Sequence, residues 1–182
     1  LSSSSAASDV YKRQAFALTK EQDRVIHALR VVSQKTGIHG MLGGQSVDVE
    51  NDGKPLEKEM LDYIYRNKTS ALIEASMMTG AILAGANEQE VSVVEKAAGN
   101  IGLAFQSQDD ILDVTSDMET LGKPIGSDEK NHKTTYVTIR GLAQAQKDVE
   151  KISERALEGV ASLSEKNVFL NELIRYLIHR KK

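Results

Sequence analysis

The stretch FQSQDDILD, residues 105–113, combines an apolar stripe with three aspartates inside a long run of helical periodicity. On an ideal helix, which turns by about 100° per residue, Asp113 lies about 40° from Asp109 and Asp110 lies about 100° from it. The apolar side chains occupy a separate arc, at roughly 200° to 340°, and are Val94, Ala97, Ala98, Ile101, Phe105, Ile111 and Leu112. The pattern predicts one long helix through residues 91–117, with an apolar back and an acidic face.

Helical signals continue on both sides of this stretch. Thr19 and Gln22 have the spacing of a capping box ahead of one periodic segment, and Pro55 opens another. Asn87 marks the cap of the long helix, and from about Thr134 we expect two more helices. No segment alternates apolar and polar residues as a half-buried strand does, and no hairpin signal is present. The fold class that the sequence predicts is all-α.

The composition argues against several classes of function. Because the chain has no cysteine, disulfides and thiolate metal sites are excluded, which fits a reducing compartment, and we expect a cytoplasmic location. The net charge of −3 argues against nucleic acid as the main partner. No apolar run reaches the roughly 18 residues of a transmembrane helix, so we expect no membrane insertion.

Residues 1–17 differ from the rest of the chain. Five of the first eight residues are serine, and the segment has neither helical periodicity nor the basic and then apolar order of a secretory signal. We therefore expect a disordered or non-native leader here, with the folded domain in residues 18–182.

The three aspartates of the central stretch indicate a metal site. Asp109 and Asp113 stand at positions i and i+4, where like charges destabilise a helix. Two carboxylates about 4 Å apart repel by about 4 kcal/mol at an effective dielectric constant of about 20. A divalent cation removes that repulsion, and oxygen ligands suit Mg²⁺, which takes its other ligands from water and phosphate. The alternative is a solvated acidic face without a ligand.

Five stretches occur in the order typical of one enzyme family. The stretches are GMLGGQSVDVE (40–50), NKTSALIEAS (67–76), GLAFQSQDDILDVTSD (102–117), LGKPIGSDEKNHKTTY (121–136) and YLIHRKK (176–182). Over residues 18–182 the chain resembles the C-terminal part of the bacterial trans-prenyl diphosphate synthases, above all those of the farnesyl type. The resemblance implies an isoprenoid-synthase-type helical bundle, of which the chain carries the C-terminal portion only, and a homodimer.

The family joins isopentenyl diphosphate to an allylic diphosphate in the presence of Mg²⁺. The allylic diphosphate leaves, the double bond of isopentenyl diphosphate attacks the resulting carbocation, and a proton is lost. The resemblance implies these two substrates, Mg²⁺ as the cofactor and farnesyl diphosphate as the product. In the matching motif, Asp109 corresponds to the principal metal ligand, and Asp110 and Asp113 correspond to its supporting carboxylates.

The substrate-binding residues also follow from the resemblance. Lys68 and Thr69 correspond to residues that hold the allylic diphosphate and face the cation, and Gln106 corresponds to a glutamine that faces the same pocket. These three residues carry the catalytic roles. Lys123 and Lys133 correspond to two lysines that grip the leaving diphosphate. Lys133 also precedes a predicted helix, whose backbone N–H groups favour an anion.

Other positions match the family less completely. Gln45 and Asp48 match a family signature, for which a packing role and a ligand contact remain open as alternatives. The basic residues 180–182 correspond to a tail that closes over bound diphosphate. Ser70 stands where the family usually has glycine. The first aspartate-rich motif and the basic pocket for isopentenyl diphosphate have no counterpart here, so we expect the chain alone to be inactive.

Three alternative functions remain. The parent enzyme could make geranyl, geranylgeranyl or longer products, because the residues that set product length lie near the first motif. The chain could be a non-catalytic helical partner subunit of a prenyl synthase, although a scaffold needs none of the lysines named above. A terpene cyclase shares the fold and an aspartate-rich motif but not this set of lysines.

Overall fold

The computed structural model describes residues 21–116, 133–178 and 180. Every helix or strand assigned within these ranges is a helix, so the predicted all-α class is confirmed. The predicted leader, residues 1–17, lies outside the described residues. The elements are α2 (Gln22–Thr36), α3 (Met41–Glu50), α4 (Lys58–Ile64), the π-helix η1 (Tyr65–Ser70), α5 (Ala71–Ala84), α6 (Glu88–Thr115), α9 (Tyr136–Arg140), α10 (Leu142–Ala161) and α11 (Val168–Ile178).

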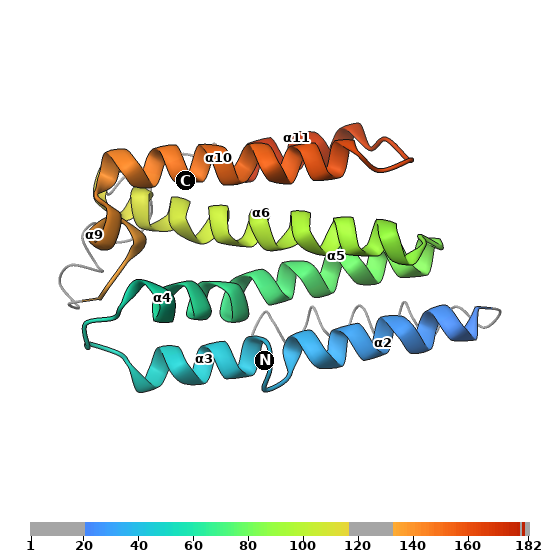
Figure 1. The fold of residues 1–182 in the computed structure, drawn as a ribbon, viewed down its shortest axis with the longest axis horizontal. Helices are drawn as coiled ribbons and strands as arrows, with labels where there is room; N and C mark the ends of the chain where they lie inside the picture. The colour runs from blue at the N-terminus through green and yellow to red at the C-terminus, as the bar shows by residue number, and fades with distance from the viewer. Residues whose placement is uncertain (1–20, 117–132, 179, 181–182) are drawn as a thin grey trace.

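The long helix α6 is the centre of the bundle. It packs against α10 and also against α5 and η1, while α2 packs against α5. In Figure 1 the helices form successive layers, with α10 and α11 along one edge and α2 and α3 along the other. The main hydrophobic core surrounds α6, and a smaller core joins α2, α5 and the first turns of α6. Functional side chains on α6 are therefore held by the most heavily packed element of the described chain.

The predicted start of α6 is confirmed. Asn87 Oδ1 accepts a hydrogen bond from the Glu90 amide at 2.9 Å, and Glu90 Oε2 accepts one from the Asn87 amide at 3.1 Å. The two bonds form a capping box that satisfies backbone donors at the helix terminus. The helix continues to Thr115, close to the predicted end.

Two local predictions are wrong. The helix α2 has Glu21 as its N-cap, without a side-chain cap bond, so Gln22 is already its first residue and cannot complete a capping box with Thr19. The segment after Thr134 forms three described helices and not two. Gly141, with φ of 75° and ψ of 150°, separates α9 from α10 in a conformation that favours glycine.

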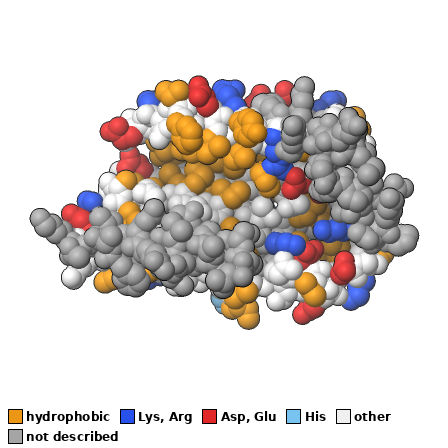
Figure 2. All heavy atoms as spheres, turned by 180° about the vertical axis from the view of Figure 1, so that it is seen from behind, with side chains coloured by type: hydrophobic (Ala, Val, Ile, Leu, Met, Phe, Trp, Pro, Cys, Tyr) orange, Lys and Arg blue, Asp and Glu red, His pale blue; other side chains and the backbone are white. Residues whose placement is uncertain are grey.

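Hydrophobic side chains form a band on the face of the molecule seen in Figure 2. Several large apolar residues of the described chain are exposed, among them Ile38, Val168, Phe169 and Tyr176. The described helices therefore do not bury all of their apolar surface against one another. None of these helices combines the length and the hydrophobicity that crossing a membrane requires.

Candidate active site

A π-helical segment carries two of the predicted site residues. Lys68 and Thr69 lie in η1, the short π-helix between α4 and α5. Such segments are rare and occur frequently at functional sites. Lys68 Nζ pairs with Asp48 Oδ2 of α3 at 2.5 Å, and Thr69 Oγ1 donates a hydrogen bond to Gln106 Oε1 of α6 at 3.0 Å. The segment thus places Lys68 against α3 and Thr69 against Gln106 of α6.

Two glycines let the backbone of η1 approach both neighbouring helices. A Cβ atom at Gly44 of α3 would lie 2.4 Å from the amide nitrogen of Lys68. A Cβ atom at Gly102 of α6 would lie 2.4 Å from the Cα atom of Ser70. Real Cβ atoms do not come so close to backbone atoms, so the segment fits only between these two glycines.

The family signature around Gln45 and Asp48 is part of this arrangement. Gly44, which precedes Gln45, allows the close approach of η1, and Asp48 forms an ion pair with Lys68, while the choice between packing and ligand contact for Gln45 and Asp48 stays open. The departure at Ser70 is accommodated, because its side chain is fully buried and its hydroxyl donates to the Gly99 carbonyl oxygen at 3.2 Å. Serine therefore adds a tie between η1 and α6 at the point where Gly102 leaves room for it.

The three predicted metal ligands lie in different environments. The side chain of Asp109 is 38% exposed, whereas Asp110 and Asp113 are only 4% and 2% exposed. The helical projection placed the three carboxylates on one acidic face, but η1 and α9 pack over α6 and cover part of that face. Among the described residues, no three acidic or histidine side chains form a group that could hold a metal ion.

Asp110 connects three elements of the scaffold. Its Oδ2 atom accepts a hydrogen bond from the Tyr65 hydroxyl at 2.6 Å and another from the Tyr136 amide at 2.7 Å. Tyr65 belongs to η1 and Tyr136 begins α9. The buried carboxylate therefore holds η1 and α9 against α6, and the sequence projection, which considers one helix at a time, missed both tyrosines.

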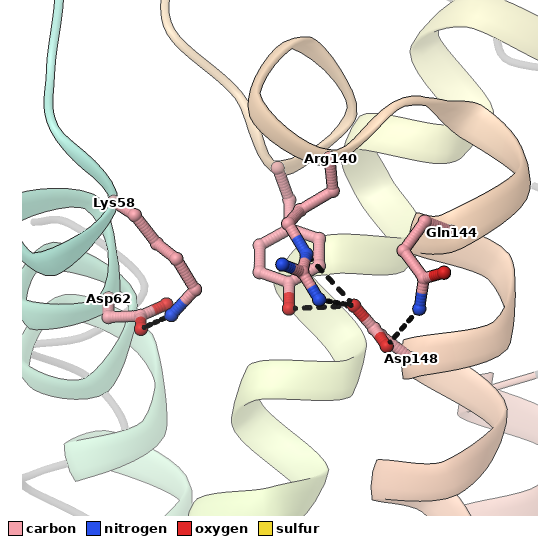
Figure 3. A network of polar contacts seen from close by, with 6 residues as sticks. Lys58, Asp62, Arg140, Gln144 and Asp148 are labelled. Carbon is pink, nitrogen blue, oxygen red and sulfur yellow. Dashed lines mark hydrogen bonds and ion pairs between the residues drawn. The ribbon is translucent and has the colours of Figure 1, made fainter.

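Figure 3 shows Arg140 and Gln144 beside Asp148 in a second polar network, and this network extends from Tyr136. Its hydroxyl donates to Asp148 Oδ2 at 3.2 Å, and Asp148 also accepts bonds from Arg140 and Gln144. Burial by itself raises the pKa of Asp148, but the bonds from Gln144, Arg140 and Tyr136 outweigh burial and lower it. The pKa of the Tyr136 hydroxyl is raised, first by burial and then by the nearby Asp148 charge. Close by, Lys58 pairs with Asp62 at 2.6 Å.

Lys133 lies beside the α3 end of the site. It lines a small pocket together with Asp48, Lys54 and Thr134, and the Leu56 amide donates to Thr134 Oγ1 at 3.0 Å. Lys68 and Lys133 therefore both lie near the Asp48 side chain. The second predicted diphosphate lysine, Lys123, falls outside the described residues.

Two backbone amides at the helix start after Lys133 have partners within the chain. The first helical residue, Tyr136, gives its amide to Asp110, and the amide of Thr138 donates to Thr135 Oγ1 at 3.2 Å. Because these two donors already have partners within the chain, they are not available to an anion. An anion at Lys133 depends on the lysine and not on these helix amides.

Arg180 is the described residue of the predicted basic tail. Its Nη2 atom pairs with Asp109 Oδ1 and lies 3.4 Å from the Phe105 carbonyl oxygen. The guanidinium carbon lies 3.6 Å from the centre of the Phe105 ring, which is a cation–π contact. The exposed aspartate of the motif is thus in contact with a positive charge from the end of the chain.

Comparisons with known proteins define the class of this protein. A profile of the family described as polyprenyl synthetase matches residues 2–173, so the chain belongs to that family. It is 37% identical over 187 residues to farnesyl diphosphate synthase of Escherichia coli (strain K12), which covers 97% of this chain and 62% of the relative. It is also 36% identical over 159 residues to geranylgeranyl diphosphate synthase of Cyanophora paradoxa, covering 87% and 53%.

A solved structure agrees with this assignment. The described fold matches a geranyltransferase of Helicobacter pylori, crystallised with magnesium and isoprenyl diphosphate, with a TM-score of 0.73 and 28% identity. The match covers 92% of this chain and 55% of that one. The helical bundle of the isoprenoid synthases, predicted from the sequence, is therefore confirmed, and the chain spans less than two thirds of the relatives that it matches.

Proposed function

We propose that this chain forms one wall of an active site that condenses isopentenyl diphosphate with an allylic diphosphate to give farnesyl diphosphate. The observation that carries the proposal is that η1 brings Thr69 to Gln106 of α6, about one turn before the partly exposed Asp109 on the same helix, and Lys68 to Asp48 of α3. A cationic lysine and hydrogen-bonding groups next to an exposed carboxylate suit a metal-bound diphosphate. The similarity to the farnesyl diphosphate synthase of Escherichia coli supports the farnesyl product.

The residues present fit Mg²⁺ as a partner of Asp109. Magnesium in proteins keeps several waters and commonly takes only one or two carboxylates, with phosphate oxygens completing its shell. Asp109 offers one such carboxylate at the surface of α6. Asp113 lies one turn further along and is buried, and Asp110 binds Tyr65 and Tyr136. We therefore assign the direct metal contact to Asp109, while Asp110 supports the site by holding η1 and α9 against α6. Asp113 stays a predicted supporting carboxylate. When bound, Mg²⁺ neutralises charge on the departing diphosphate.

The other residues bind and orient the substrate. Lys68 and Lys133 attract the diphosphate, and Asp48 fixes the direction of the Lys68 ammonium group. The hydrogen bond between Thr69 and Gln106 supports the proposal that their hydroxyl and amide oxygens face the developing allylic cation. The partial negative charge on these oxygens stabilises positive charge that develops nearby. Lys123 is proposed as a second grip on the diphosphate, as the sequence predicts.

We propose that the remaining wall of the site comes from a segment outside this chain. The coverage of 62% and 53% of the two relatives supports this, as does the exposed apolar band in Figure 2. The cytoplasmic location and the homodimer stay predictions from the sequence.

A different product length is the second candidate. The Cyanophora paradoxa relative is named as a geranylgeranyl diphosphate synthase, and its identity to this chain is nearly the same as that of the farnesyl type. The reaction and the residue roles are common to both candidates, and only the number of condensations differs.

The experiment is an activity assay of a fusion protein. The part of the Escherichia coli relative that precedes the residue aligned with Leu18 is joined ahead of Leu18, and the fusion is incubated with labelled isopentenyl diphosphate, geranyl diphosphate and Mg²⁺. We expect metal-dependent farnesyl product from the fusion and none from the 182-residue chain. Longer labelled products would favour the second candidate.

The same assay tests the role of Asp109. Asp109→Ala in the fusion should lower turnover by about 10²- to 10³-fold, the scale of losing one stabiliser of transition-state charge. Asp23→Ala, which removes an exposed carboxylate of α2, is the matched control and should leave turnover unchanged. Turnover of Asp109→Ala within a few-fold of the unmodified fusion would contradict the assignment of Asp109 as the metal contact.

A further inference from the structure

The guanidinium group of Arg180 lies where the proposed metal should bind. It contacts the Asp109 carboxylate, the Phe105 carbonyl oxygen and the Phe105 ring, all within about one turn of α6. Its side chain is only 9% exposed. Arg180 reaches this position from the end of the chain, 71 residues from Asp109 in sequence. The contact is thus a long-range one that the local helix does not require.

The position of Arg180 depends on the charge of Asp109. A guanidinium group loses hydration when it is covered, and an opposite charge at hydrogen-bond distance offsets that loss. Of the described groups in contact with Arg180, Asp109 is the one that carries a negative charge, since the other two are a backbone carbonyl and an aromatic ring. A divalent cation on Asp109 would remove this compensation and place a like charge beside the guanidinium group.

We propose that Arg180 is an internal counter-cation that occupies Asp109 in the metal-free chain and competes with the divalent metal for it. The proposal rests on the proposed function, because it takes Asp109 as the metal contact. By thermodynamic linkage, docked Arg180 lowers the affinity of Asp109 for the metal by the same factor by which bound metal lowers the affinity of Asp109 for Arg180. Metal binding therefore releases the guanidinium group from α6, next to the Lys68 and Gln106 region where the anionic substrate binds.

This competition for Asp109 determines how the metal and the diphosphate bind together. Without diphosphate, Arg180 opposes the metal at Asp109. With diphosphate present, the released arginine gains a new anionic partner, since guanidinium groups bind phosphate oxygens in a bidentate way. Metal alone should therefore bind weakly, whereas metal together with diphosphate should bind cooperatively.

The first test measures binding of Mn²⁺ alone, used as a paramagnetic probe for the divalent site. Mn²⁺ is titrated into the ¹⁵N-labelled chain, and the broadening of amide signals around residues 105–113 gives the half-saturation concentration. Arg180→Gln should lower that concentration by about fivefold or more, the usual scale of a coupling between two sites. Arg175→Gln, which removes an exposed arginine of α11, is the matched control and should change nothing. An unchanged or weakened Mn²⁺ affinity in Arg180→Gln would overturn the proposal.

The second test uses the unmodified chain, so it does not depend on how a variant folds. Trypsin cleaves after arginine, and the docked, covered Arg180 should be cleaved more slowly than the exposed Arg175. Addition of Mg²⁺ should speed cleavage after Arg180 by about fivefold or more, while cleavage after Arg175 stays constant, as followed by mass spectrometry. Equal rates after Arg180 with and without Mg²⁺ would contradict release by the metal.

A third variant separates this proposal from the proposed function. Asp109→Asn should abolish the Mn²⁺-induced broadening around residues 105–113. If the broadening persists in Asp109→Asn, the metal contact itself is wrongly assigned and the proposed function loses its metal site. If the broadening disappears in Asp109→Asn but Arg180→Gln binds Mn²⁺ like the unmodified chain, the metal site stands and the competition by Arg180 fails.

Discussion

Asp109 and Asp110 are neighbours in sequence, yet they belong to two different regions of the molecule. Asp109 lies on the open side of α6, where its partner is the guanidinium group of Arg180. Asp110 lies on the covered side, where η1 and α9 each donate a hydrogen bond to it. The roughly 100° turn between adjacent residues sends one carboxylate to the site and the other into the scaffold. In this acidic motif Asp109 is therefore available to the site, whereas Asp110 stabilises the packing of η1 and α9 on α6.

The largest effect that this comparison predicts is on stability. Asp110→Ala leaves the buried donors of Tyr65 and Tyr136 without their acceptor. Each buried donor that loses its partner costs about 1 to 3 kcal/mol, so the loss of both bonds should lower the free energy of unfolding by about 2 to 6 kcal/mol. Urea unfolding followed by circular dichroism measures this difference.

The matched control for that experiment is Asp109→Ala. Since Asp109 is partly exposed and pairs with the last described residue of the chain, its loss should change the free energy of unfolding by less than about 1 kcal/mol. Equal losses in the two variants would mean that the two carboxylates are not divided between scaffold and site.

A smaller effect is expected where η1 packs on α6. Gly102→Ala places a methyl group 2.4 Å from the Cα atom of Ser70, and such overpacking against backbone costs about 1 to 3 kcal/mol. The displacement of η1 should also weaken diphosphate binding, because Lys68 and Thr69 lie in it.

Gly80→Ala is the matched control on α5. A Cβ atom at Gly80 has no neighbour within 4 Å, so the better helix propensity of alanine should raise the free energy of unfolding by up to about 1 kcal/mol. Thermal unfolding of both variants provides the comparison. A stable Gly102→Ala protein would show that the close approach of η1 to α6 is dispensable.

The parts of the structure that were predicted correctly rest on local signals. The apolar period of α6 and the capping box at Asn87 are set by residues within one or two turns of each other, and both are confirmed. The same holds for the all-α class, because no strand pattern competes with the helical one. The resemblance in the motifs of residues 40–136 also led to the correct family.

The parts that were missed depend on contacts between distant segments. A helical projection cannot know that α9 covers Asp110, because Tyr136 lies 26 residues away in sequence. The π-helical turn at Lys68 and Thr69 has no local sequence signal, and it depends on the close approach of Gly44 and Gly102 from two other helices. The pairing of Arg180 with Asp109 is likewise a tertiary contact.

The most direct test of the division between the two aspartates is calorimetric titration of the chain with inorganic diphosphate in the presence of Mg²⁺. Asp109→Asn should weaken binding by about tenfold or more, which corresponds to about 1.4 kcal/mol, with an unchanged melting temperature. Asp110→Asn should bind within about twofold of the unmodified chain and melt at a lower temperature. Full binding by Asp109→Asn, together with loss of binding by a folded Asp110→Asn, would contradict the account.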